Sequence, residues 1–89
     1  MSSHTKIATL QAERIAKRLL NHWKHKFEVT DDGQEKRIMM PTATVVLSSE
    51  SEYLNVRILS EETDLSRLQQ VVLDHLIRMG DEPLSAVWQ

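Results

Sequence analysis

The chain has 89 residues, a length that forms one domain with a thin hydrophobic core. Hydrophobic residues make up 40% of it and charged residues 27%, which is ordinary for a globular protein. The lack of cysteine excludes a disulfide scaffold and a thiolate metal site, and the net charge of −2 argues against a strongly basic nucleic-acid binder.

The N-terminal residues 1–6 contain no apolar segment of the kind found in signal peptides, and every apolar run is far too short to cross a membrane. We therefore expect a cytoplasmic protein. We also expect a single domain over residues 1–89, with about residues 1–4 as a flexible N-terminus. The charge is +3 over residues 1–37 and −5 over residues 38–89, an asymmetry that can steer a partner.

The first two elements are a strand and a helix. Residues 5–8 predict a short strand with Ile7 pointing inward, and Thr9 is a suitable N-cap because its hydroxyl can accept a free backbone N–H. A helix from about Leu10 to Lys24 is predicted by one apolar stripe at helical spacing, formed by Ala12, Ile15, Ala16, Leu19, Leu20 and Trp23. A basic outer face lies off this stripe and contains Arg14, Lys17, Arg18 and Lys24.

Four strands follow, predicted by alternating polar and apolar residues over 26–30, 36–40, 43–47 and 54–59. The first two are joined by a hairpin turn in which Gly33 supplies a positive φ. The polar residues 48–52 predict a loop between the last two. Because each strand has one apolar face, we expect the sheet to be covered on one side only.

The last predicted element is a second helix. It is expected to begin near Ser60 or Thr63, with acidic residues in its first turn, and to end at Gly80. Its apolar face contains Leu65, Leu68, Val72, Leu76 and Met79. Residues 84–88 fit either a final edge strand or a segment packed on the core. The predicted fold class is α+β, with two helices packed on one face of a mainly antiparallel sheet in the order β-α-β-β-β-β-α.

Four stretches carry a family resemblance: Lys6-Ile7-Ala8-Thr9 before Ala12-x-Arg14, Leu19-x-x-His22-Trp23-x-His25-Lys26, Val71-Val72-x-x-His75-Leu76-x-Arg78, and Trp88. Together they resemble the bacterial family called domain of unknown function 2218 over nearly the whole chain. The chain departs from the family at four positions. Ile15 stands where an aromatic residue is common, Trp23 and Met79 stand where phenylalanine is common, and Thr42 replaces a glycine after the turn proline.

The resemblance implies a TATA-binding-protein-like arrangement of a sheet and two helices. It also implies a link to siderophore-interacting flavin reductases, because members of the family are often encoded beside them or fused to them. It implies no activity and no functional residue, and a fold of this kind does not by itself imply DNA binding.

Three histidines are candidate ligands of a metal ion or haem. His22 and His75 each lie three residues after a stripe residue of their helix, so they approach each other if the helices pack side by side. His25 follows His22 at i+3 and could add a third nitrogen. Imidazole suits zinc, iron, copper and haem. The alternative is two half-buried structural histidines, hydrogen-bonded to the backbone or to a carboxylate such as Glu13 or Asp74.

Two surfaces are candidate interfaces. The uncovered sheet face is expected to carry Met39, Val46, Tyr53 and Leu59, which predicts self-association as a homodimer, the alternative being isolated surface hydrophobes. The basic face of the first helix could contact nucleic acid or an acidic protein. We favour a protein, because four cations on a net-negative chain without interleaved aromatic residues are a weak nucleic-acid footprint.

The sequence contains no phosphate-binding glycine loop, no nucleophile elbow and no zincin pattern. We therefore expect no catalytic residue and a small non-enzymatic accessory or binding domain, linked to siderophore or iron uptake, that needs no cofactor. Its expected partner is a siderophore-interacting reductase. The alternative is a haem- or metal-binding module that uses His22, His25 and His75.

Overall fold

The structure is a computed structural model that describes residues 2–89. Five strands, β1 (Ser2–Ala8), β2 (Glu28–Asp31), β3 (Glu35–Met39), β4 (Ala43–Ser49) and β5 (Tyr53–Ser60), and two helices, α1 (Ala12–Trp23) and α2 (Ser66–Gly80), follow one another as β1-α1-β2-β3-β4-β5-α2. The strands form one sheet in the order β1-β5-β4-β3-β2. Every pairing is antiparallel. The predicted order and α+β class are confirmed.

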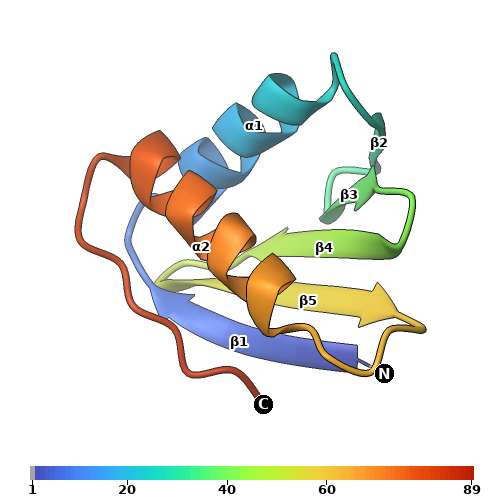
Figure 1. Ribbon diagram of the computed structural model, residues 1–89. Coiled ribbons are helices and arrows are strands. Elements are labelled where there is room, and N and C mark those ends of the chain that lie inside the picture. Colours follow the sequence, from blue (N-terminus) through green and yellow to red (C-terminus); the bar gives the residue numbers. More distant parts are fainter. Residues whose placement is uncertain (1) are drawn as a thin grey trace.

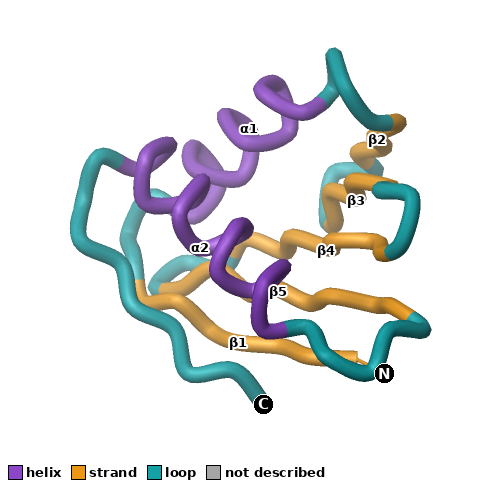
Figure 2. The backbone as a smooth tube through the Cα atoms, in the orientation of Figure 1, coloured by secondary structure: helices purple, strands orange, loops and turns teal. Residues whose placement is uncertain are grey.

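Both helices lie on the same side of the sheet and leave its other face uncovered (Figures 1 and 2). Strands β2 to β5 form a meander, because each connection is a short turn between antiparallel neighbours. Gly33 has the expected positive φ, at 92°, in the β2–β3 turn. The first strand joins the free edge of β5, where Ile7 lies opposite Leu54.

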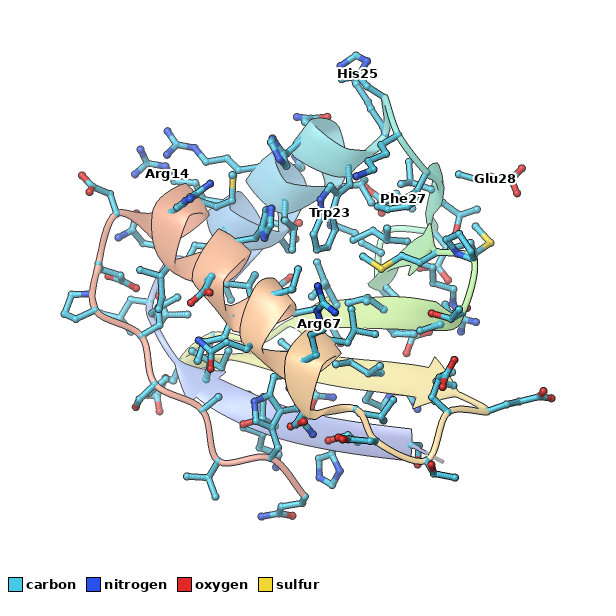
Figure 3. All side chains as sticks on the ribbon, viewed as in Figure 1. Arg14, Trp23, His25, Phe27, Glu28 and Arg67 are labelled. Carbon is cyan, nitrogen blue, oxygen red and sulfur yellow. The ribbon has the colours of Figure 1, made fainter. Side chains whose placement is uncertain are left out.

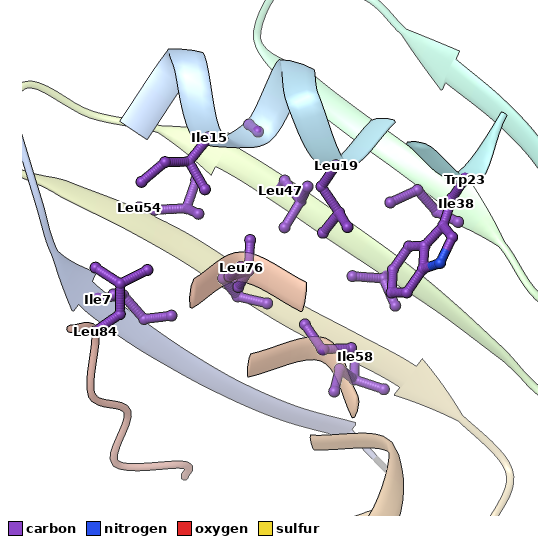
Figure 4. Packing of buried hydrophobic residues seen from close by; sticks show 14 of the residues in the cluster. Ile7, Ile15, Leu19, Trp23, Ile38, Leu47, Leu54, Ile58, Leu76 and Leu84 are labelled. Carbon is purple, nitrogen blue, oxygen red and sulfur yellow. The ribbon is translucent and has the colours of Figure 1, made fainter. Parts of the chain in front are cut away.

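The hydrophobic core lies between the helices and the sheet (Figure 4). The strands supply alternate residues to it, and the inward faces of β4 and β5 are buried at Ala43, Val45, Leu47, Leu54, Val56 and Ile58. The helices supply Ile15, Leu19, Trp23, Val72 and Leu76, as their spacing predicted, whereas Leu68 is only half-buried at the edge.

The first strand and helix differ from prediction at their ends. The flexible N-terminus expected over about residues 1–4 is corrected, because residues 2–4 are paired with β5, while Met1 lies outside the described residues. Helix α1 begins at Ala12 rather than Leu10. The Thr9 hydroxyl does accept a backbone N–H, that of Gln11 at 3.1 Å, but it does so in the turn before the helix.

The second helix begins at Ser66, later than expected, so the acidic residues 61, 62 and 64 lie outside its first turn. Asp64 instead accepts hydrogen bonds from the backbone N–H and hydroxyl of Ser66, at 3.0 and 2.7 Å. At the other end Gly80 belongs to the helix, and Asp81 adopts the left-handed conformation, with φ 51°. A Cβ at Gly80 would lie 2.9 Å from Ile15 Cδ1, so the glycine allows the two helices to approach closely.

The C-terminal segment returns across the edge of the molecule beside β1 (Figure 1). Leu84 is buried, and Ala86 and Trp88 pack against the core. Gln89 and His4 exchange two backbone hydrogen bonds of 2.8 and 3.0 Å. Of the two expectations for residues 84–88, packing on the core is the correct one. Neither helix in the described part of the chain is long and apolar enough to span a membrane.

Candidate functional site

The seam between the two helices brings His22 and His75 together. Their ring centroids are 5.4 Å apart, and the planes are tilted by 46°. His22 lies in the last turn of α1 and is exposed, whereas His75 lies in the second half of α2 and is half-buried. His22 follows Leu19 of the α1 stripe by three residues, and His75 follows Val72 of the α2 stripe by three residues, so both rings lie on the side where the helices face each other. The predicted approach is confirmed.

His75 is held on two sides. Its Nδ1 lies 2.7 Å from the carbonyl oxygen of Val71, one turn earlier in the same helix. Because a carbonyl only accepts, Nδ1 donates the proton, and in the neutral ring the lone pair is then on Nε2. The ring also packs against Trp23, with centroids 4.8 Å apart. Trp23 is itself in edge contact with Phe27 at 6.0 Å.

His25 does not join this pair. Helix α1 ends at Trp23, so the i+3 relation between His22 and His25 is not continued on a helix. His25 lies on the turn after the helix and points away from the body of the molecule (Figure 3). Among residues 2–89 no three His, Cys, Asp or Glu side chains are grouped to hold a metal ion. The site therefore contains two protein nitrogens rather than three.

The uncovered sheet face is more polar than expected. Val46 is only 1% exposed, because it lies in register between Arg37 and Arg57. Both arginines donate to Glu35, at 2.8 and 3.1 Å, and this network lies across β3, β4 and β5.

The remaining residues of that predicted interface differ in exposure. Leu59 is 38% exposed, while Met39 and Tyr53 are half-buried. Lys6 lies 5.1 Å from the ring centroid of Tyr53. Self-association through this face stays a prediction, although Val46 is no longer available to it. Light scattering would check the mass against the 10.3 kDa monomer.

A buried lysine is a feature that the sequence analysis missed. The side chain of Lys36 is 4% exposed, on the helix-facing side of β3. Its ammonium lies 2.5 Å from Glu13 of α1 and 3.6 Å from Asp31. Glu13 also accepts the Ser49 hydroxyl at 3.0 Å. The hydrogen bond from Lys36, and then that from Ser49, lower the pKa of Glu13.

The signal for this ion pair was in the strand alternation. Lys36 precedes Ile38 by two residues and therefore shares its inward face. A buried ammonium needs an anionic partner. Glu13 is a candidate because it lies next to the apolar stripe of the first helix, beside Ala12 and one turn before Ala16. Lys36 and Glu13 neutralise each other, so the pair fastens α1 to β3 and leaves neither group free.

The helices and the turn after α1 concentrate positive charge. We call residues 12–26 and 66–80 the helix layer; they contain seven Lys/Arg and two Asp/Glu, a net charge of +5. The rest of the chain contains four and eleven, a net charge of −7. One anion of the helix layer, Glu13, is already paired with the buried Lys36. Arg18 donates to the Met79 carbonyl at 3.0 Å and so links the two helices at the C-terminal end of α2.

A surface groove with a volume of about 690 Å³ lies away from the histidines, between the β3–β4 turn and the end of β5. Its lining is Met40, Pro41, Thr42, Ala43, Thr44, Leu59, Ser60, Glu61 and Glu62. Two of the lining residues are hydrogen-bonded to each other, since the Ser60 hydroxyl donates to the Thr42 carbonyl at 2.6 Å. The groove brings together no combination of groups that suggests a reaction.

Comparison with known proteins agrees with the resemblance seen in the sequence. Residues 4–89 match the family described as an uncharacterized protein conserved in bacteria, DUF2218. The chain is similar to PA4090 from Pseudomonas aeruginosa, whose NMR structure superposes with a TM-score of 0.82 at 32% sequence identity, over 99% of this chain and 94% of the other. No curated protein matches it. Because the family match covers nearly the whole chain, the protein belongs to the DUF2218 family.

Proposed function

We propose that this protein is a non-enzymatic accessory domain that binds an acidic protein surface through its helix layer. The observation that carries the proposal is the separation of charge, +5 on the helix layer against −7 on the rest of the chain. A face with one dominant sign attracts a partner of the opposite sign and orients it during encounter. The net charge of −2 conceals this separation.

A protein suits the helix layer better than a nucleic acid does. Val71 is 38% exposed, and Leu20, Leu68 and Ile77 are half-buried, so apolar area lies among the cations. Protein interfaces combine such apolar area with a polar rim. Trp23 is 5% exposed and has little surface on which a base could stack. The likeness to the TATA-binding-protein fold stays a prediction and adds no support for DNA binding.

The candidate partner is a siderophore-interacting flavin reductase, which places the domain in iron uptake in the cytoplasm. This part of the proposal comes from the family resemblance, since members are often encoded beside such reductases or fused to them. A separate accessory chain and a fused domain would both need a surface that recognises the reductase, and the helix layer supplies one of definite charge.

The test is a titration of the purified chain with purified reductase by calorimetry, in NaCl from 50 to 500 mM. We expect binding that weakens as salt is added, because exposed charges are screened. The double variant Lys17→Glu, Lys24→Glu reverses two exposed charges of the helix layer and should weaken binding at least ten-fold. Lys6→Glu, on the uncovered sheet face, is the matched control and should bind as the unmodified chain does. Equal losses in both variants, or no binding at any salt concentration, would refute the proposal.

Ligand binding by the histidines is the second candidate function, favoured by the approach of His22 and His75. Two imidazoles on opposite sides of a haem iron, at metal–nitrogen distances of about 2.0–2.1 Å, would have ring centroids roughly 6.4 Å apart. The observed 5.4 Å is shorter and fits a bent arrangement around a small ion better. Of the two ligand classes that the histidines suggested, the geometry favours a metal ion over a bis-histidyl haem.

A further inference from the structure

We propose that His22 and His75 form a binding site for one divalent transition-metal ion on the surface seam between α1 and α2. The site goes beyond partner binding by the helix layer, because it depends on two imidazole nitrogens rather than on positive charge. It supplies two protein ligands, one from each helix, and leaves the other coordination positions to water.

The distance between the rings is the first support. An imidazole nitrogen bonds zinc at about 2.0–2.1 Å, which places the ring centroid roughly 3.2 Å from the metal. At a tetrahedral angle, two such rings have centroids about 5.2 Å apart. The observed separation of His22 and His75 is 5.4 Å. His22 is exposed, so a rotation of its side chain would direct a nitrogen toward the ion that His75 binds.

The orientation of His75 is the second support. Metal-binding histidines usually donate their other ring N–H to a carbonyl or carboxylate, which fixes the tautomer and the ring plane. The hydrogen bond from Nδ1 to the Val71 carbonyl, at 2.7 Å, has this form and leaves the Nε2 lone pair free to bind a metal. Trp23, at 4.8 Å, packs against the same ring and limits its rotation. The orientation of the His75 ring on α2 is therefore set before an ion arrives.

The ligand chemistry selects the ion. Two neutral imidazoles without a carboxylate or thiolate suit Cu²⁺, Ni²⁺ and Zn²⁺ and are poor ligands for Mg²⁺ and Ca²⁺. The Irving–Williams order places Cu²⁺ above Ni²⁺ and Zn²⁺ in affinity. The expected order of binding is Cu²⁺ first, then Ni²⁺ and Zn²⁺, with no measurable binding of Mg²⁺.

The charge around the site gives the proposal a distinctive salt dependence. A dication on the helix layer, with its net charge of +5, is repelled by the surrounding lysines and arginines. Salt screens that repulsion, so metal affinity should rise with ionic strength. Binding of an acidic protein to the same layer should fall with ionic strength. The failure of one proposal is thus distinguishable from the failure of the other.

The experiment is a calorimetric titration of the tag-free chain with Cu²⁺, Ni²⁺ and Zn²⁺ at pH 7.5 in 50 and 300 mM NaCl, with electron paramagnetic resonance of the Cu²⁺ form. We expect one ion per chain, tighter binding at the higher salt concentration, and nitrogen hyperfine splitting from two imidazoles. His22→Gln and His75→Gln should each lower the affinity at least ten-fold. His25→Gln is the matched control, because this exposed histidine on the next turn should leave the affinity unchanged.

His22→Gln is the decisive variant, because His22 is exposed and its replacement should leave the fold intact, as circular dichroism can verify. His75→Gln also removes a packed ring, so its thermal unfolding is measured alongside. A His22→Gln chain that binds Cu²⁺ as tightly as the unmodified chain would overturn the proposal. An equal loss of affinity in His25→Gln would also overturn it, since the ion would then be bound elsewhere.

Discussion

The two helices share one face of the sheet but are attached to it differently. Helix α1 buries five of its twelve residues, whereas α2 buries two of its fifteen. Helix α1 also carries Glu13, whose ion pair with Lys36 reaches into the sheet. The polar link from α2 to the sheet is a hydrogen bond from Gln69 to the Ser3 hydroxyl, at 2.7 Å. Helix α1 is thus attached firmly to the sheet, and α2 is attached more loosely.

This difference bears on both proposals. Segments with few buried apolar groups open locally at lower free energy than the core does. Helix α2 therefore has the freedom to adjust its half-exposed residues to a partner, while α1 holds the other half of the seam in place. His22 comes from the firmly attached helix and His75 from the loosely attached one, so an ion bound by both would fasten α2 to α1.

The largest expected loss of unfolding free energy comes from truncating a residue of the α1 apolar stripe. Leu19 is 0% exposed, so Leu19→Ala removes its transfer free energy and leaves a cavity, at about 2–5 kcal/mol of unfolding free energy. Leu68→Ala, at a half-buried position of α2, should cost about 1 kcal/mol. Urea denaturation of both variants measures the difference. Equal losses would mean that α2 is attached as firmly as α1.

Leu76 sharpens the same comparison from within α2. It is 0% exposed, and Leu76→Ala should cost about 2–5 kcal/mol as Leu19→Ala does. The two helices then differ in how many residues they bury, rather than in how well each buried residue is packed.

The polar links provide the next test. Glu13→Ala leaves the ammonium of Lys36 buried with only Asp31 nearby, and hydrogen bonds to charged groups contribute about 1.5–3 kcal/mol. Gln69→Ala removes a neutral hydrogen bond and should cost about 0.5–1.5 kcal/mol. The double change of Glu13→Gln with Lys36→Met should regain part of the first loss, because it removes the unpaired charge. A larger effect at Gln69 than at Glu13 would reverse the comparison.

The sequence predicted the apolar parts of this arrangement well, because burial of a stripe follows from helical spacing. It also predicted the approach of His22 and His75, since both stand three residues after a core residue. The ion pair escaped prediction because lysine usually faces solvent, and only the register of β3 shows that Lys36 cannot. The burial of Val46 depends equally on register, which brings one arginine beside it from each neighbouring strand.

The ends of the helices were the least predictable parts. Residues 60–64 contain capping residues and acidic residues in a suitable order, so several starting points had similar local support. The hydrogen bond from the Ser66 backbone N–H to the Asp64 carboxylate stabilises the start at Ser66. At the end of α2 the close approach to Ile15 favours a glycine at position 80 within the helix, and the left-handed residue is the next one, Asp81.

A smaller effect is expected on the stability of the protein at acidic pH. The hydrogen bonds from Lys36 and Ser49 hold the pKa of Glu13 below its ordinary value of 4.5, so the folded state favours the charged carboxylate. That contribution to stability is complete above about pH 4.5 and is lost as the pH falls through the lowered pKa of the folded state. Glu13→Gln should therefore flatten the fall in urea midpoint between about pH 4.5 and 3. Part of the fall should remain, because hydrogen bonds also lower the pKa values of Asp32 and Asp64. An unchanged profile would show that the link to α1 is not electrostatic.

The smallest effect lies where α2 ends. Asp81 adopts φ 51°, a conformation that costs a residue with a Cβ about 1 kcal/mol relative to glycine. Its carboxylate also follows the C-terminus of α2, where the helix dipole disfavours negative charge. Asp81→Gly relieves both and should raise the unfolding free energy by about 0.5–1 kcal/mol after the greater flexibility of the unfolded chain is allowed for. Asp81→Asn removes only the charge and should give a smaller gain, so thermal unfolding of the pair separates the backbone effect from the dipole effect. If neither variant gains stability, the end of α2 is already relaxed, and the loose attachment of this helix is due to its sparse burial alone.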